Sequence, residues 1–192
     1  DYDVLCELGL RSMQKAIYSI DNLGHYGLAS KCYCHFTSPI RRFPDETVHR
    51  VLKLILHGED LNGSDLNNLS KELYRMAEHS STKERNAIEC ERDVEDMKMA
   101  EYMHEHIGEE FKGKISSVVP SGMFVRLPNL IEGRVHVGSM HGDYFNIIEE
   151  TQTIVGKKTG KKYKLGDEIV VKCVDTSKIE GTIDFELVKE MQ

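Results

Sequence analysis

The sequence predicts an α+β protein in which a mainly helical first part is followed by a small, closed β-barrel. Two observations carry this prediction. Apolar residues recur at helical spacing through much of the first 107 residues. From residue 108 the period changes to two, and five short segments rich in valine and isoleucine are separated by glycine and proline turns. We therefore expect two domains, residues 1–107 and residues 108–192.

Length and composition are those of an ordinary globular protein. The 192 residues are 40% hydrophobic, and no apolar run approaches the length of a membrane span. No signal-peptide pattern opens the chain, and the five cysteines show no metal-like spacing, so we expect a cytoplasmic protein with reduced thiols and no membrane partner. The net charge of −7 argues against a general polyanion binder. Any nucleic-acid site must therefore be a local basic patch or channel.

The first 36 residues predict a helix, a turn and a strand. A broken helical face extends from residue 3 to about residue 20. Gly24 and Gly27 indicate a tight turn around the two residues between them. Residues 31–36 then alternate in the manner of a short strand.

Further helices are expected between residues 44 and 107. Pro44 and the two acidic residues after it suit a helix start, and Gly58 is a plausible end. A second helix is expected from about residue 66 to residue 77. The spacing of Ser81 and Glu84 resembles a capping box, which predicts that a separate long helix begins there.

Two adjacent arginines, Arg41 and Arg42, lie on a short segment just before the helix start at Pro44. Their forked N–H donors, beside the free backbone N–H groups of a helix start, suit a phosphate oxygen. The alternative is that both arginines simply pair with carboxylates, which is the commoner role for such residues. Spacing alone does not decide between these interpretations.

Resemblance to a known family favours the phosphate interpretation. The run HFTSPIRRFPD at residues 35–45, followed by VHR at 48–50, resembles a signature near the end of the catalytic (RNB) domain of the ribonuclease II/ribonuclease R family. The resemblance implies that this segment lines a channel for single-stranded RNA and that Arg41 contacts the scissile phosphate in catalysis. It places Thr37, Ser38 and Arg42 on this RNA-lining segment, and Glu91 of the long helix near the bound strand. Tyr33 and His35, on one side of the expected strand, are candidates to face RNA, and packing within the strand is the commoner role for such residues. Phe43 stands where the family has tyrosine.

The second part of the chain predicts a five-stranded barrel. The expected strands are residues 111–119, 123–127, 133–137, 168–174 and 182–185. That number suits an OB-fold, which commonly binds oligonucleotides on one face. A barrel whose face is merely solvated is the alternative, because fold alone does not imply function.

Three motifs in this part resemble an S1-type RNA-binding domain: GMFV at 122–125, EGRVHV at 132–137 and LGD at 165–167. The resemblance implies stacking of bases on Phe124 and His136, to which Tyr144 adds a third ring, and phosphate contacts by Arg134 and Lys114. Ser121 stands where such domains usually carry an aromatic, and Gly138 where serine is usual. The lysine-rich segment 157–164 is a further candidate for RNA backbone contact.

Together these resemblances imply the C-terminal part of a processive 3′–5′ exoribonuclease, a hydrolase that degrades single-stranded RNA to nucleoside 5′-monophosphates. They imply two Mg²⁺ ions held by clustered aspartates upstream, with no metal ligand in this chain. We therefore expect this part to need the upstream portion of the same catalytic domain and to be inactive alone. The alternative is a non-catalytic S1-type RNA-binding module of a translation-associated protein, which explains residues 111–187 but not the arginine segment. A scaffold that uses the long acidic helix for protein contacts explains neither motif set.

Overall fold

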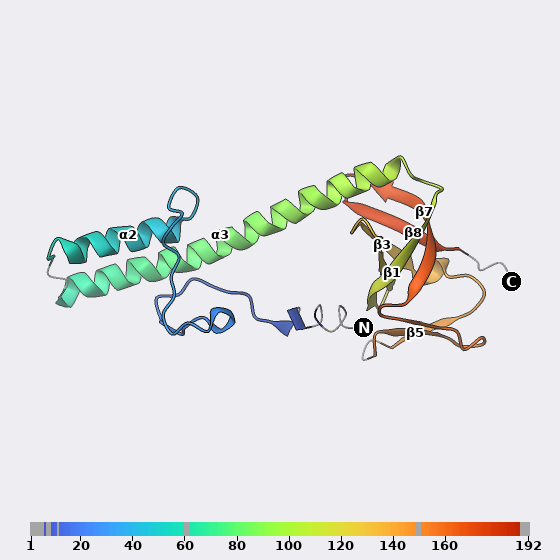
Figure 1. Ribbon diagram of the computed structural model, residues 1–192, viewed down its shortest axis with the longest axis horizontal. Helices are drawn as coiled ribbons and strands as arrows, with labels where there is room; N and C mark the ends of the chain where they lie inside the picture. The colour runs from blue at the N-terminus through green and yellow to red at the C-terminus, as the bar shows by residue number, and fades with distance from the viewer. Residues whose placement is uncertain (1–5, 7–8, 11, 60–61, 149–150, 189–192) are drawn as a thin grey trace. The chain divides into compact units, whose positions relative to one another are not determined.

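The computed structural model describes residues 6, 9–10, 12–59, 62–148 and 151–188. The chain divides into two compact units, residues 14–89 and a second unit that combines residues 1–13 with 90–192 (Figure 1). The first unit is mainly helical and the second contains a closed β-barrel, so the predicted α+β fold is confirmed. The predicted boundary between residues 107 and 108 stays a prediction.

Helix α2, Phe43–Leu56, has the start that the sequence predicts. Pro44 lies in its first turn, where a missing N–H costs no hydrogen bond, and Asp45 and Glu46 follow at the positive end of the helix dipole. The helix ends just before Gly58, whose φ of +71° suits glycine. In Figure 1 α2 lies beside the first part of α3, and the Thr47 hydroxyl contacts the Met76 sulfur at 3.8 Å.

Helix α3, Gly63–His104, is one continuous helix of 42 residues. The predicted start of a separate helix at Ser81 is therefore wrong. No glycine or proline interrupts the chain between residues 64 and 104, so nothing forces the backbone out of the helix. The Ser81 hydroxyl donates back to the carbonyl of Ala77, at 2.9 Å, and accepts from the backbone N–H of Tyr18. It acts as a bridge to another segment, not as a cap.

The segment before α2 is largely irregular. A short 3₁₀ helix, η1 (Tyr26–Leu28), is closed by an isolated bridge between His25 and Ser30, which confirms the turn near Gly24. The predicted strand at 31–36 is wrong, because no neighbouring segment supplies the backbone partners that a strand needs. Residues 14–19 are not helical, which contradicts that part of the helix expected from 3 to 20. Most of its start lies outside the described residues.

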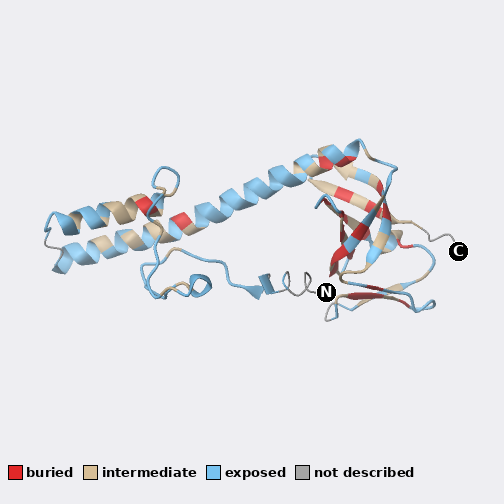
Figure 2. Ribbon diagram, in the orientation of Figure 1, coloured by how far each residue is buried: buried red, intermediate tan, exposed pale blue. Residues whose placement is uncertain are grey.

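The unit of residues 14–89 has no buried apolar side chain among its described residues. Its buried positions are Asp45 and Ser80, both polar, while Ile40, Leu23 and Leu56 are largely exposed (Figure 2). Polar contacts and partly buried side chains therefore hold this unit together. None of the helices in the described part of the chain has the length and apolar character needed to cross a bilayer.

All five predicted barrel strands are confirmed. They are β1 (Glu110–Val119), β2 (Gly122–Arg126), β3 (Glu132–His136), β7 (Glu168–Ser177) and β8 (Thr182–Leu187). They close in the order β1-β2-β3-β8-β7, with every pairing antiparallel except that of β3 with β8.

Between β3 and β7 the chain forms a short 3₁₀ helix, η2 (Val137–Ser139), and a second sheet of three strands that the sequence did not predict. Its strands are β4 (Phe145–Ile148), β5 (Thr153–Gly156) and β6 (Lys162–Lys164).

The barrel encloses the main hydrophobic core of the described chain, shown red in Figure 2. Phe185 is its largest fully buried side chain, and its ring lies directly over Gly133 of β3. A β-carbon at position 133 would collide with that ring, so this strand position requires glycine. Side chains alternate along β2 and β3, which leaves Met123, Val125 and Val135 inside.

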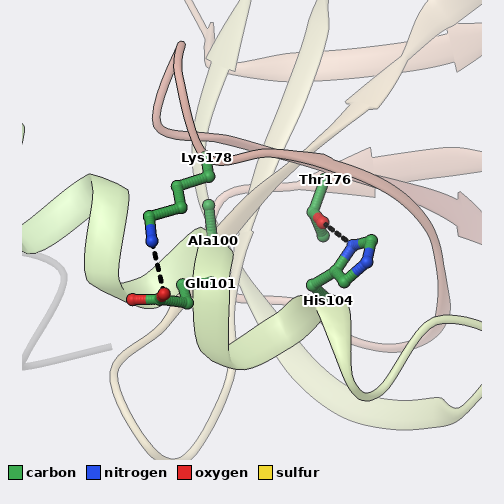
Figure 3. Close-up of a pocket in the computed structure, with 5 residues that line it drawn as sticks. All are labelled: Ala100, Glu101, His104, Thr176 and Lys178. Atoms are coloured by element: carbon green, nitrogen blue, oxygen red, sulfur yellow. Dashed lines mark hydrogen bonds and ion pairs between the residues drawn. The ribbon is translucent and has the colours of Figure 1, made fainter.

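The last turns of α3 belong to the barrel. Ala100 and Met103 are completely buried in the barrel core, and the Cys173 thiol lies 3.9 Å from the Met103 carbonyl. A hollow of about 320 Å³ lies beside this joint. Figure 3 shows the side chains that line it, with Lys178 reaching toward Glu101. Hydrogen bonds from Lys178 first, and then from Lys98, lower the pKa of Glu101 to about 2. The hollow is thus bordered by an ionised pair that joins α3 to the turn that follows β7.

We expect Met103→Ala to lower the free energy of unfolding of the barrel by about 2–5 kcal/mol, because it leaves a cavity in a closed core. Glu105→Ala, an exposed change one half-turn away, is the matched control and should stay within about 0.5 kcal/mol of the parent. Urea unfolding of both variants measures the difference. Equal stabilities would mean that α3 does not contribute to the barrel core.

Candidate nucleic-acid interface

The arginine segment forms a tight turn that one buried carboxylate holds in place. The Ser38 carbonyl accepts from the backbone N–H groups of Arg41, at 3.3 Å, and of Arg42, at 3.0 Å, so Ser38 and Pro39 form a chain reversal. The Asp45 carboxylate accepts from the Ser38 backbone N–H at 2.7 Å and from the Arg42 guanidinium at 2.8 Å. The turn and the first turn of α2 are therefore joined through Asp45.

Asp45 is ionised despite having no exposed surface. Burial raises the pKa of its carboxyl, but the hydrogen bonds from Ser38 and Arg42 outweigh burial and hold that pKa below its ordinary value. One oxygen, Oδ1, and the Nε of Arg42 are buried without a hydrogen-bond partner. The sequence placed Asp45 only as a favourable helix-start residue, and nothing in its spacing revealed this buried pair.

The two adjacent arginines have different surroundings. Arg42 is engaged with Asp45, as the carboxylate-pairing alternative expects. The exposed guanidinium of Arg41 makes no hydrogen bond or ion pair with any residue in the described part of the chain. The structure thus presents Arg41 on a braced turn, with its forked donors available to a ligand. An RNA contact by Arg42 stays a prediction, since one face of its guanidinium is already occupied.

Aromatic rings pack edge to face just before this turn. A hydrogen bond of 3.0 Å joins His35 Nδ1 to the Tyr18 hydroxyl. The rings of His35 and Tyr33 pack edge to face. Tyr33 in turn meets His25, with ring centroids 5.1 Å apart. Tyr33 and Thr37 are exposed, whereas His35 is half-buried. Tyr33 and Thr37 are open to a ligand, and His35 and Ser38 also have structural contacts.

The predicted binding face of the barrel is formed by neighbouring strand positions. Phe124 on β2 lies directly opposite Arg134 on β3, and Gly122 lies opposite His136. Because alternate residues point inward, Phe124, Arg134 and His136 lie on the outer surface of the strand pair. The His136 ring accepts from the backbone N–H of Gly138 through Nδ1, at 3.0 Å, which leaves Nε2 to carry the proton.

The cations on this face are balanced by carboxylates. Arg134 bonds the Asp184 carboxylate through Nε, at 3.0 Å, and through Nη2, at 2.9 Å. Lys114 lies 3.6 Å from Glu168, but both side chains are well exposed, so that pair holds Lys114 only weakly. Asp184 is a residue that sequence reasoning missed, because its partner comes from a strand 50 residues away.

Tyr144 and Glu91 lie apart from that strand pair. Tyr144 is 71% exposed next to the second sheet, and the Lys158 ammonium lies 5.8 Å from its ring centroid. Glu91 is exposed on α3, and its side chain makes no hydrogen bond or ion pair with another described residue. Roles for both in RNA binding stay predictions.

Comparison with known proteins gives two domain matches. Residues 2–58 match the RNB domain, and residues 105–187 match the S1 RNA binding domain. The chain is 48% identical to ribonuclease R 1 of Lactococcus lactis, over 95% of this chain and 22% of that protein. It is 45% identical to ribonuclease R of Thermotoga maritima, over 94% of this chain and 26% of that protein.

A solved structure has the same fold throughout. RNase R of Mycoplasma genitalium in complex with ribose-methylated single-stranded RNA aligns with a TM-score of 0.89 at 33% identity, over 97% of this chain and 29% of that one. The chain spans about a quarter of the length of these relatives.

We expect Arg42→Ala to raise the pKa of Asp45, because burial then opposes ionisation with only the Ser38 hydrogen bond and the weaker influence of His35 left against it. Arg41→Ala, the matched control, should leave that pKa unchanged. Since the folded pKa lies below the ordinary 3.8, ionised Asp45 stabilises the turn above pH 3.8, and that stabilisation is lost as pH falls through the folded value. NMR titration of the carboxyl carbon tests this, and equal shifts in both variants would refute it.

Proposed function

We propose that this chain, which belongs to the ribonuclease R family through the end of an RNB domain and an S1 domain, is the C-terminal part of a processive 3′–5′ exoribonuclease. The proposed substrate is single-stranded RNA and the products are nucleoside 5′-monophosphates. We propose that the chain works in the cytoplasm together with the remainder of the catalytic domain. That remainder would cover the exposed apolar residues of the helical unit, such as Ile40, Leu23 and Leu56.

One observation carries the catalytic side of the proposal: Arg41 is exposed, has no hydrogen-bond or ion-pair partner among the described residues, and lies on a turn that Arg42 and Asp45 hold in place. A guanidinium fork matches two oxygens of a phosphate. Because the backbone of the turn is already held in place, less main-chain entropy is lost when Arg41 binds. We propose that Arg41 grips the scissile phosphate, where negative charge grows during hydrolysis. Arg42 then serves chiefly to hold the turn.

Metal ions enter this proposal only through the rest of the protein. Nucleases of this family usually depend on a metal, and we propose Mg²⁺. Within the described residues, no group of three or more His, Cys, Asp or Glu side chains is arranged to hold one. We propose that the metal ligands lie in a part of a longer protein outside this chain, and that this chain alone does not cleave RNA.

The S1 domain supplies sequence-tolerant attachment in this proposal. Phe124 presents a ring on the outer surface beside Arg134, and His136 lies one pair further along the same two strands. Rings stack on any base, and nearby cations attract the RNA backbone. We propose that Lys114, which is only weakly paired, contacts that backbone, and that Arg134 does so by donating to a phosphate as well as to Asp184.

We expect Phe124→Ala and His136→Ala each to weaken binding of single-stranded RNA by about 1–3 kcal/mol, with little dependence on base identity, because each removes a stacking ring. Fluorescence anisotropy with labelled oligo(A) and oligo(U) measures the effect. Ile179→Ala, which removes a fully exposed apolar side chain elsewhere on the barrel, is the control. A folded double variant with unchanged affinity would show that this face does not bind RNA.

In the complete enzyme, we expect Arg41→Ala to lower single-turnover cleavage at saturating RNA by roughly 10²-fold or more, while the RNA dissociation constant rises much less. Arg41→Lys should rescue poorly, because a point charge cannot make two parallel hydrogen bonds.

Lys53→Ala removes another exposed cation, on α2, and should leave cleavage intact. Normal cleavage by Arg41→Ala at saturation would contradict the proposed role and leave Arg41 as an ordinary surface residue.

A further inference from the structure

The turn between β5 and β6, residues 157–161, is the most basic exposed feature of an acidic protein. Lys157, Lys158 and Lys161 lie on it and Lys162 follows at the start of β6. Such turns are usually flexible, and cations on a flexible turn give only non-specific electrostatic attraction to a polyanion. Hydrogen bonds to a carboxylate from a different segment instead hold this turn in place.

Asp143 lies two residues before β4, the first strand of the second sheet. Its carboxylate accepts hydrogen bonds from three backbone N–H groups and one hydroxyl. Its Oδ2 accepts from the backbone N–H of Lys158 (2.9 Å), from that of Thr159 (2.7 Å) and from the Thr159 hydroxyl (2.7 Å). Its Oδ1 accepts from the backbone N–H of Tyr144 at 2.7 Å. Hydrogen bonds, first of all the one from the Thr159 backbone N–H, lower the pKa of Asp143 to about 2. They outweigh partial burial, which raises that pKa. The anchor is therefore ionised at any physiological pH.

Two further features show that the turn is shaped around this carboxylate. A β-carbon at Gly156 would lie only 2.5 Å from Asp143 Oδ2 and 2.6 Å from Thr159 Oγ1, so glycine there makes room for the anchor. The backbone N–H of Lys157 donates to the carbonyl of Tyr144 at 2.8 Å. Asp143 and Tyr144 thus hold adjacent residues of the turn.

The anchored backbone places the side chains of Tyr144 and Lys158 beside each other on an open surface. Tyr144 is largely exposed, and the Lys158 ammonium lies 5.8 Å from its ring centroid. A flat ring beside a cation can stack on a base while the cation meets the adjoining phosphate. Neither side chain would keep this relation if the turn moved freely.

We propose that Asp143 is a positioning residue that fixes Tyr144 and Lys158 as a second RNA contact of the S1 domain, separate from Phe124 and His136. This inference rests on the proposed function, because it assumes that the domain binds single-stranded RNA. It adds a contact on the three-stranded sheet and assigns a role to a carboxylate that would otherwise repel the ligand.

The sign of one mutational effect tests the proposal. If Asp143 were only a negative charge near lysines, neutralising it would strengthen binding of a polyanion. If Asp143 holds the turn, Asp143→Asn should weaken binding, because the amide replaces one acceptor oxygen with a donor that faces backbone N–H groups. Glu180→Gln removes the same charge from an exposed turn of the same barrel and is the matched control.

The experiment measures binding of labelled oligo(A) by the 192-residue chain at several salt concentrations. We expect Asp143→Asn to weaken binding about five- to tenfold, and Glu180→Gln to leave it unchanged or slightly tighter. Lys158→Ala should then cost little more in the Asp143→Asn background, whereas Phe124→Ala should keep its full effect in both backgrounds. Equal or tighter binding by Asp143→Asn overturns the proposal.

A second variant covers loss of folding. Thr159→Val removes one hydroxyl donor from the same anchor with little change of shape, and we expect weaker binding in the same direction, about twofold or more. If circular dichroism shows that Asp143→Asn is unfolded, unchanged binding by Thr159→Val overturns the proposal. A parent chain that does not bind oligo(A) would instead refute the proposed function itself, so the two failures are distinguishable.

Discussion

The parallel pairing of β3 with β8 closes the barrel, and the geometry of the candidate RNA-binding face depends on that closure. Arg134 is brought level with Asp184, and Val135 with Phe185, so one residue step decides which side chains are inside. Phe185 occupies the core only because Gly133 has no side chain. The antiparallel pairing of β2 with β3 then places Phe124 and Arg134 opposite each other on the outer surface. Core packing and the binding face are thus set together.

Three carboxylates of this protein hold cations and turns in place. Asp45 holds the arginine turn, Asp143 holds the lysine-bearing turn, and Asp184 holds Arg134. Such pairs reduce the net positive field, which costs general attraction to RNA, but they give each cation or ring a defined position. The proposed binding surface of a chain with a net charge of −7 thus rests on a few positioned cations and rings rather than on a general positive field.

The helical unit depends on polar contacts to a degree that its composition does not suggest. Its described residues bury no apolar side chain, although its sequence contains ordinary amphipathic helices. Apolar residues such as Ile40 and Leu56 remain exposed, as expected for a unit that packs against further protein. The chain spans about a quarter of the length of its relatives, and the remainder of the catalytic domain that we propose would cover those faces.

Sequence alone determined the elements whose signals are local. The five barrel strands follow from alternation and glycine turns, and the start of α2 follows from Pro44 and the acids after it. The motifs at residues 35–45 and 122–137 indicated both candidate surfaces. Errors arose where local signals were weak or ambiguous. Alternation at 31–36 lacks a partner strand, the Ser81 pattern sits inside a continuous helix, and the short strands of the second sheet were missed.

Only the tertiary structure decided which charged groups are free and which are occupied. Arg41 and Arg42 are neighbours of the same type, yet the fold buries Asp45 beside one and leaves the other unpaired within the described chain. Asp143 reaches its turn across 15 residues, and Asp184 reaches Arg134 across 50. Ion pairs and hydrogen bonds act over a few ångströms in space, while periodicity reports only neighbours along the chain. Residue types and spacing therefore indicate which groups can bind RNA, and the fold selects among them.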